Sequence, residues 1–158
     1  MENKPIRVAE LFAGVGGFRL GLEGLPSLAW KGEHTVAYHP KGTGFKVVFG
    51  NQWEPGTNIQ HAADVYAKRW SMTMTDEGEG WRIFHSEDGD MFANEDIHRF
   101  TSHEINIQRV PDFDLLVGGF PCQDYSVARS TSGELGIEGE KGKLWYPIKK
   151  LVARMNKK

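Results

Sequence analysis

The chain has 158 residues, of which 39% are apolar and 25% are charged. That length suits one domain with a hydrophobic core, and the net charge of −2 argues against a domain that binds nucleic acid across its whole face. No apolar run reaches the length of a membrane span, and the polar segment Met1–Arg7 is not a secretory signal, so we expect no membrane partner.

The first predicted elements are a strand, a glycine turn and a helix. The segment Ile6–Phe12 predicts a short strand, and Ala13–Gly17 predicts a tight turn because three of its residues are glycine. Phe18, Leu22 and Leu25 then recur at helical spacing. This part of the chain therefore predicts strand, loop and helix in that order.

The same alternation continues further along the chain. Phe45–Phe49 predicts a second strand, and a helix should follow with one apolar face made of Ile59, Ala62, Ala63, Tyr66 and Trp70. Leu115–Val117 predicts a later strand, and a last helix should begin near Pro147. The segments 26–44 and 71–95 break this pattern and are interpreted as insertions that form hairpins or loops. Alternating strands and helices predict an α/β domain with a largely parallel sheet.

The glycine turn is the first candidate for a binding site. Ligands of such sheets bind at the carboxyl ends of the strands, and glycines there let backbone amides approach a ligand closely. The turn does not match the dinucleotide fingerprint, since the third glycine would fall at Arg19. A nucleotide-binding oxidoreductase is therefore a weak alternative. The simplest alternative is that the turn only connects the strand to the helix and binds no ligand.

Two further candidates follow predicted strands. Gln52 and Trp53 come after the second strand, where a polar side chain can hold a ribose and an aromatic ring can stack on a purine. Asp96 and Ile97 stand where a third strand should end, and a carboxylate there could accept a hydrogen bond from an exocyclic amine. Taken alone, each pair is more simply explained by a helix cap or a turn.

Cys122 is the only cysteine of the chain, so it cannot form an internal disulfide. A chain without a disulfide framework favours a cytoplasmic location. The six histidines and one cysteine form no zinc motif, so we expect no metal site. Cys122 follows Pro121 just past a predicted buried strand, which suits a partly exposed, reactive thiol, although a lone cysteine is more often a small buried hydrophobe.

The two segments "ELFAGVGGFRLGLE" and "DFDLLVGGFPCQDYSVA" together resemble the bacterial DNA cytosine-5 methyltransferases. The pattern D-x-L-x(2)-G-x-P-C-x(2)-Y-S, from Asp114 to Ser126, is the nucleophile signature of that family. The resemblance implies a Rossmann-like fold that uses S-adenosyl-L-methionine. It also implies transfer of a methyl group to carbon 5 of a cytosine flipped out of double-stranded DNA, as part of a restriction-modification system.

The resemblance assigns a role to individual residues. Cys122 would be the nucleophile that attacks carbon 6 of cytosine, while Gln123 and Ser126 would contact DNA. The residues expected to contact the cofactor lie in several separate segments: Phe12, Ala13, Gly14, Val15, Gly16, Gly17, Gln52, Trp53, Asp96, Ile97, Pro121 and Leu144. Within this set Trp53 would stack on adenine, and Asp96 with Ile97 would hold the adenine edge.

Several positions depart from the family pattern. The family often has an acid where Gln52 stands, so Glu54 is expected to share the contact with the ribose, and Glu10 replaces a more usual aspartate. The strand with the family's Glu-Asn-Val motif and the target recognition domain are not present in 1–158.

We therefore expect a fold truncated after the nucleophile loop and the following helix, and a chain with negligible activity alone. A complementary C-terminal polypeptide should restore activity. The alternatives left open are one subunit of a split methyltransferase and a non-catalytic fragment that binds S-adenosyl-L-methionine.

Overall fold

The computed structural model describes residues 4–24, 44–78, 80–119 and 142–155. The strands are β1 (Ile6–Leu11), β2 (Phe45–Asn51), β3 (Thr73–Gly78), β4 (Trp81–His85), β5 (Met91–Asn94) and β6 (Leu115–Gly118). The helices are α1 (Gly17–Glu23), α2 (His61–Arg69), α3 (Ile97–Ser102), α4 (Glu104–Arg109) and α5 (Trp145–Met155), and a 3₁₀ turn, Gly142–Leu144, precedes α5.

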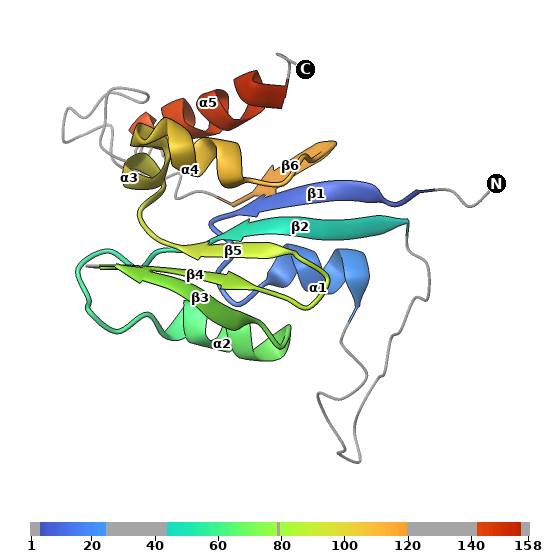
Figure 1. Ribbon diagram of the computed structural model, residues 1–158, viewed down its shortest axis with the longest axis horizontal. Coiled ribbons are helices and arrows are strands. Elements are labelled where there is room, and N and C mark those ends of the chain that lie inside the picture. The colour runs from blue at the N-terminus through green and yellow to red at the C-terminus, as the bar shows by residue number, and fades with distance from the viewer. Residues whose placement is uncertain (1–3, 25–43, 79, 120–141, 156–158) are drawn as a thin grey trace, which may run out of the picture.

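Within the described ranges the strands form one six-stranded sheet in the order β3-β4-β5-β2-β1-β6 (Figure 1). The four strands from β5 to β6 are parallel, and the hairpin β3–β4 joins antiparallel to β5. The predicted α/β class with a largely parallel sheet is therefore confirmed. The segment 71–95 contributes the hairpin at one edge and also β5, which pairs with the central strand β2.

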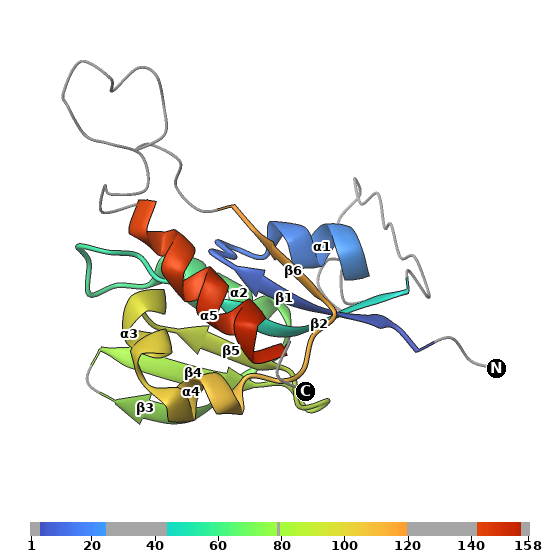
Figure 2. The ribbon, with the colours of Figure 1, turned by 90° about the horizontal axis from the view of Figure 1, so that it is seen from above.

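Helices cover both faces of the sheet, so the domain has three layers. Figure 2 shows α3, α4 and α5 on one face and α1 and α2 on the other. The residues Val8–Leu11 of β1 are all buried, as expected of a central parallel strand that is covered on both sides. Side chains alternate along β4 and β5, so Ile83 and Met91 pack towards α3 and α4, while Phe84 and Phe92 pack against α2.

The register of the parallel strands brings their carboxyl ends to one edge of the sheet. Leu11 of β1 stands beside Asn51 of β2 and Gly118 of β6, and Asn51 in turn stands beside Ala93 of β5. The segments that follow β1, β2, β5 and β6 therefore begin next to one another. The amino end of α5 points to the same side of the molecule (Figure 2).

Two predicted helical faces differ from the observed ones. Ile59 lies before α2 and is 58% exposed, because α2 begins only at His61. Phe18 is 46% exposed, because the short helix α1 turns Arg19 towards the protein interior. The described part of the chain contains no helix with the length and apolar character needed to cross a membrane.

Candidate functional site

The loop between β1 and α1 has an unusual backbone. The φ angles of Phe12, Gly14 and Gly16 are 54°, 55° and 86°. These values lie in the left-handed region, which residues other than glycine rarely adopt. A Cβ atom on Gly16 would lie 2.1 Å from the Trp70 ring, so this glycine is required by a close approach to α2. A Cβ atom on Gly14 would meet nothing within 4 Å, so the loop faces open space there.

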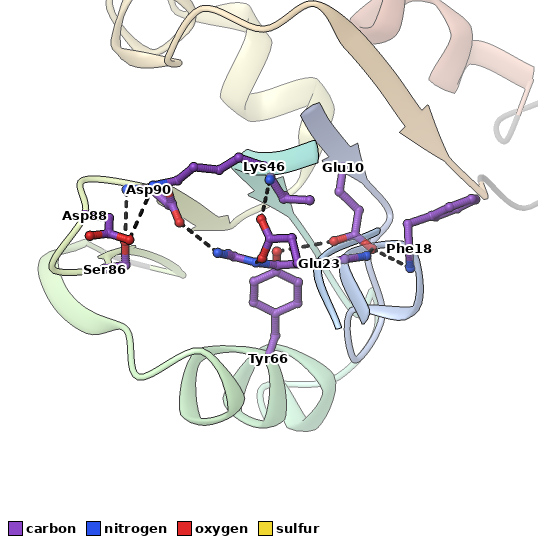
Figure 3. A network of polar contacts seen from close by, with 10 residues as sticks. Glu10, Phe18, Glu23, Lys46, Tyr66, Ser86, Asp88 and Asp90 are labelled. Atoms are coloured by element: carbon purple, nitrogen blue, oxygen red, sulfur yellow. Dashed lines mark hydrogen bonds and ion pairs between the residues drawn. The ribbon is translucent and has the colours of Figure 1, made fainter. Parts of the chain in front are cut away.

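Glu10 fixes the start of the helix that follows this loop. Its side chain is fully buried at the end of β1, and Oε1 accepts hydrogen bonds from the backbone amides of Phe18 (3.1 Å) and Arg19 (3.3 Å). The hydroxyl of Tyr66 donates to Oε2 at 3.3 Å (Figure 3). Burial raises the pKa of Glu10, against the lowering effect of these hydrogen bonds. The carboxyl group thus caps α1 from the neighbouring strand.

A second set of polar contacts ties α1 to the sheet. The Arg19 guanidinium is 6% exposed and forms ion pairs with Glu23 and Asp90, each at 2.7 Å. Glu23 accepts from the backbone amide of Val47 in β2, and Lys46 lies 3.3 Å from Asp90 (Figure 3). A buried cation needs such partners, and together they hold α1 against β2 and the start of β5.

Gln52 joins the glycine loop to the end of β2. Its Oε1 accepts from the Gly14 amide at 2.8 Å, and its Nε2 donates to the Trp53 carbonyl at 3.3 Å. The adjacent backbone adds a bond from the Ala13 amide to the Asn51 carbonyl at 3.0 Å. The glycine loop and the Gln52–Trp53 segment, predicted from separate motifs, are therefore in direct contact.

The other residues of the glycine loop lie close to the hydrogen bond between Gly14 and Gln52. Ala13 is buried against α2, Val15 is 45% exposed, and Gly17 is the first residue of α1. The carbonyl of Val15 accepts from Arg69 of α2 at 2.8 Å. All six residues Phe12–Gly17 thus lie at the carboxyl edge of the sheet.

Glu54, expected to share the ribose contact, serves α2 in this structure. Its Oε2 accepts from the backbone amide of Ala62 at 3.1 Å, which satisfies one of the amides at the start of that helix. The Glu54 amide in turn donates to Oε1 of Gln60 at 2.8 Å. These contacts hold the segment after Trp53 against the first turn of α2.

Asp96 and Ile97 follow β5 at the same edge. Oδ1 of Asp96 accepts from the His98 amide at 2.7 Å, so this carboxylate caps α3, while Ile97 is 3% exposed and belongs to the core. The buried Asn51 side chain donates to the carbonyls of Ala93 and Glu95, at 3.0 and 2.9 Å. The end of β2 therefore sets the path of the chain into α3.

Trp53 is half-buried and lines a cavity of about 640 Å³. Trp81 and Arg82 from the start of β4, and Arg99 from α3, line the same cavity. Leu144, at the end of the 3₁₀ turn before α5, is partly buried and packs against the core cluster that includes Leu151. In the described ranges no three acidic, histidine or cysteine side chains gather as a metal site would require.

Pro121, Cys122, Gln123 and Ser126 lie outside the described residues. The strand that leads to them, β6, ends at Gly118 beside Leu11 of β1. A Cβ atom on Gly118 would lie 2.9 Å from the Leu11 carbonyl oxygen, so a glycine is needed for the two strands to approach there. The strand β6 thus ends at the edge that carries the glycine loop.

Sequence reasoning missed several polar residues that build this edge. Glu10 was noted only as a substitution, although a carboxylate inside an apolar strand just before a glycine turn signals a buried cap. Asn94 and Gln60 are 1% and 5% exposed and join the ends of β5 and β2. Their contacts depend on strand order and register, and no short sequence pattern signals them.

Comparisons with known proteins match this chain to one family. A family model described as C-5 cytosine-specific DNA methylase matches residues 6–158. The Type II methyltransferase M.Sau3AI of Staphylococcus aureus is 42% identical over 143 residues, which are 90% of this chain and 26% of that protein. M.HhaI of Haemophilus parahaemolyticus is 28% identical over 147 residues, which are 93% of this chain and 30% of that protein. The chain thus spans less than a third of the length of either relative, and it belongs to the family of C-5 cytosine-specific DNA methylases.

Proposed function

We propose that this chain binds S-adenosyl-L-methionine and carries the nucleophile of a DNA (cytosine-5-)-methyltransferase. The observation that carries the proposal is the convergence of three loops at the carboxyl edge of the sheet. The Gly14 amide bonds to the Gln52 side chain at 2.8 Å, and the Gln52 amide bonds to the Ala93 carbonyl at 3.1 Å. The segments expected to hold the cofactor thus lie next to one another, in a chain whose family is established.

The residues present fit this cofactor. Gly14 combines a left-handed backbone with open space, so a ligand can approach the loop where any side chain would intrude. Trp53 is partly exposed on the adjoining loop and offers a ring face for the adenine. Asp96 and Ile97 would hold the edge of the adenine. We assign Phe12–Gly17 and Pro121 to the methionine side of the cofactor, Gln52 to the ribose, and Leu144 to a further contact with the cofactor. When bound, the cofactor supplies an electrophilic methyl group.

Cys122 performs the covalent step. Its thiolate adds to carbon 6 of a cytosine flipped out of double-stranded DNA, which forms a carbon–sulfur bond and makes carbon 5 nucleophilic. Carbon 5 would then attack the methyl carbon, whose bond to the sulfonium sulfur breaks to leave S-adenosyl-L-homocysteine. A water molecule would take the proton from carbon 5, and the bond between carbon 6 and sulfur would break to release the Cys122 thiolate and the methylated base. Gln123 and Ser126 hold the DNA near this centre. The modification would protect host DNA within a restriction-modification system.

A polypeptide that carries the remaining parts of the methyltransferase, continuous with this chain or separate from it, is proposed to complete the site. The sequence 1–158 contains no Glu-Asn-Val motif, which in this family supports attack at carbon 5, and the chain covers only 26% and 30% of two relatives. In the part of the chain that the structure describes, β6 pairs with β1 and has no strand on its outer side, where Leu115 is 38% exposed. A further parallel strand fits this edge.

The test measures transfer of a radioactive methyl group from the cofactor to DNA. The chain alone should show negligible transfer, and adding a polypeptide with the Glu-Asn-Val strand and a recognition domain should restore it. Cys122→Ser in the reconstituted complex should abolish transfer while cofactor binding persists. Full, sequence-specific transfer by the chain alone would overturn the need for a partner.

The second candidate is binding of S-adenosyl-L-methionine without turnover. It needs only the glycine loop and the Gln52 segment, which the hydrogen bond from the Gly14 amide to the Gln52 side chain joins at 2.8 Å. If reconstitution restores transfer and Cys122→Ser leaves it unchanged, the nucleophile role is wrong. If no complementary polypeptide restores transfer but the chain binds the cofactor, the binding function stands in its place.

A further inference from the structure

Arg82 of the hairpin β3–β4 reaches the carboxyl edge of the sheet. In the antiparallel pairing of β4 with β5, Arg82 stands opposite Asn94, the last residue of β5. Its Nε and Nη2 atoms both donate to Oδ1 of Asn94, at 3.1 and 2.8 Å. The third nitrogen, Nη1, donates to Asp64 of α2 at 2.8 Å. Arg82 therefore contacts the end of the strand from which the proposed adenine-binding segment departs.

The orientation of the Asn94 amide follows from this contact. A guanidinium group can only donate hydrogen bonds, so the Asn94 oxygen must face Arg82 and the amide nitrogen must face away. Nδ2 of Asn94 donates to the Gln52 carbonyl at 2.8 Å and to Oε1 of Gln60 at 3.0 Å. Because Asn94 is 1% exposed, water cannot replace Arg82 at that oxygen without a local opening.

Gln60 continues the hydrogen-bond network from Asn94 to the residues that precede α2. Its Nε2 donates to the carbonyls of Glu54 (2.9 Å) and Thr57 (3.1 Å), and its Oε1 accepts from the Glu54 amide (2.8 Å). Both ends of the segment Gln52–Gln60, which we call the tryptophan loop, are thus bonded to Asn94. Trp53 lies on this loop and shares a cavity of about 640 Å³ with Arg82.

We propose that Arg82 is a positioning residue that sets the tryptophan loop, and with it Trp53, through the Asn94 amide. This inference rests on the proposed function, in which Trp53 stacks on the adenine of S-adenosyl-L-methionine. The hairpin β3–β4 would then support the cofactor site, although it lies outside the segments that resemble the family's motifs. Asp64 of α2 holds the same guanidinium from its outer side, through the ion pair with Nη1 at 2.8 Å.

The variant Arg82→Ala leaves the Asn94 oxygen without its charged donor. We expect the dissociation constant for S-adenosyl-L-methionine, measured by calorimetry on the 158-residue chain, to rise about tenfold. Arg82→Lys should recover only part of the affinity, because an ammonium group cannot present two donors in the same plane. Thr75→Val is the control and should bind as the unchanged chain does, because it removes only the bonds from Thr75 to His85 and to the Ile83 carbonyl within the same hairpin.

A double-mutant cycle separates positioning from a general loss of stability. If Arg82 acts through Trp53, Arg82→Ala should cost almost no further affinity in a chain that already carries Trp53→Ala. An equal cost in both backgrounds would show that Arg82 acts by another route and would overturn the inference.

Hydrogen exchange at the Glu54 amide, which bonds to Gln60, provides a measurement without cofactor. Arg82→Ala should speed this exchange, while Thr75→Val should not. If the unchanged chain fails to bind the cofactor, the proposed function fails, and exchange alone decides whether Arg82 holds the loop. If Arg82→Ala leaves the exchange of the Glu54 amide unchanged, the inference that Arg82 holds the tryptophan loop is also wrong.

Discussion

The Gln52 side-chain oxygen accepts a hydrogen bond from the backbone amide of Gly14 at 2.8 Å, so the residue expected to face the ribose is already bonded to the glycine loop. An amide side chain has a single oxygen, and its nitrogen points to the Trp53 carbonyl. In the described structure Gln52 therefore holds two loops together. A ribose hydroxyl that needs an acceptor would have to share this oxygen with Gly14.

This relationship predicts that Gln52→Glu strengthens cofactor binding. A carboxylate can keep the Gly14 bond with one oxygen and offer the other to the ribose, so we expect the dissociation constant to fall roughly tenfold, the effect of one charge-assisted hydrogen bond. Gln52→Ala should weaken binding because it releases Gly14. Calorimetry measures both, and Gln108→Glu, which adds the same charge on exposed α4, is the control. Equal affinities of the Glu and Ala variants would contradict this account.

Gly16→Ala tests the approach of the glycine loop to α2. The added Cβ would lie 2.1 Å from the Trp70 ring at a φ of 86°, so the loop or the ring must move. We expect the free energy of unfolding to fall by about 1–3 kcal/mol, measured by urea titration. Gly21→Ala is the matched control, because a Cβ there meets nothing within 4 Å and alanine favours the helix by about 0.5–1 kcal/mol. A Gly16→Ala protein as stable as Gly21→Ala would refute the close contact.

Much of the fold could be predicted because its signals are local. The strands predicted at Ile6–Phe12 and Leu115–Val117 and the glycine turn each follow from a run of neighbouring residues. The structure confirms the two strands, with bounds of Ile6–Leu11 and Leu115–Gly118. The parallel arrangement then places the predicted loops at one edge without knowledge of any contact. The family resemblance assigns Gly14 and Gln52 to one cofactor site, and the hydrogen bond between them is consistent with that assignment.

The supporting contacts could not be predicted because they join distant parts of the chain through strand register. Arg82 meets Asn94 only because β4 pairs antiparallel with β5, and a shift of one residue would turn Arg82 to the other face. Glu10 meets Tyr66 across 56 positions of sequence. The sequence around each of these residues is ordinary for a strand or a helix and gives no sign of the contact. The role of each residue can therefore be recognised only in the folded domain.

Arg7 and Asp114 provide a test at the opposite edge of the sheet. The Arg7 side chain donates to both carboxylate oxygens of Asp114 at 2.8 and 3.0 Å, and these bonds lower the pKa of Asp114 to about 2. Arg7→Gln should therefore raise this pKa towards the ordinary value of 3.8, followed by NMR titration of the carboxyl carbon. Arg109→Gln, which removes an ion pair with Asp76, should leave the Asp114 titration unchanged.

The sign of the matching stability effect follows from the lowered pKa. Asp114 stabilises the fold at pH values above the ordinary pKa of 3.8, and this contribution is lost as the pH falls through about 2. The unfolding curves of Arg7→Gln and the unchanged chain should therefore differ above pH 3.8 and converge at lower pH. A constant difference across this range would mean that the bond does not depend on the charge of Asp114.

The contribution of Glu10 to stability should change with pH in the opposite direction, because burial raises the pKa of Glu10 above the ordinary value of 4.5. Between that value and the raised one, the folded chain binds more protons than the unfolded chain, so the free energy of unfolding falls as the pH rises. The effect is about 1.4 kcal/mol for each unit by which the pKa is raised, and it levels off above the folded value.

Glu10→Gln removes this titration and keeps the contacts. The amide oxygen can accept from Phe18 and Arg19, and the amide nitrogen can donate to the Tyr66 oxygen. Urea unfolding of both proteins from pH 4.5 upwards should show Glu10→Gln gaining stability relative to the unchanged chain as the pH rises. Glu87→Gln, at an exposed turn, is the control and should follow the unchanged chain. A Glu10→Gln protein that loses relative stability with rising pH would mean that the ionised carboxylate is the form that the fold prefers.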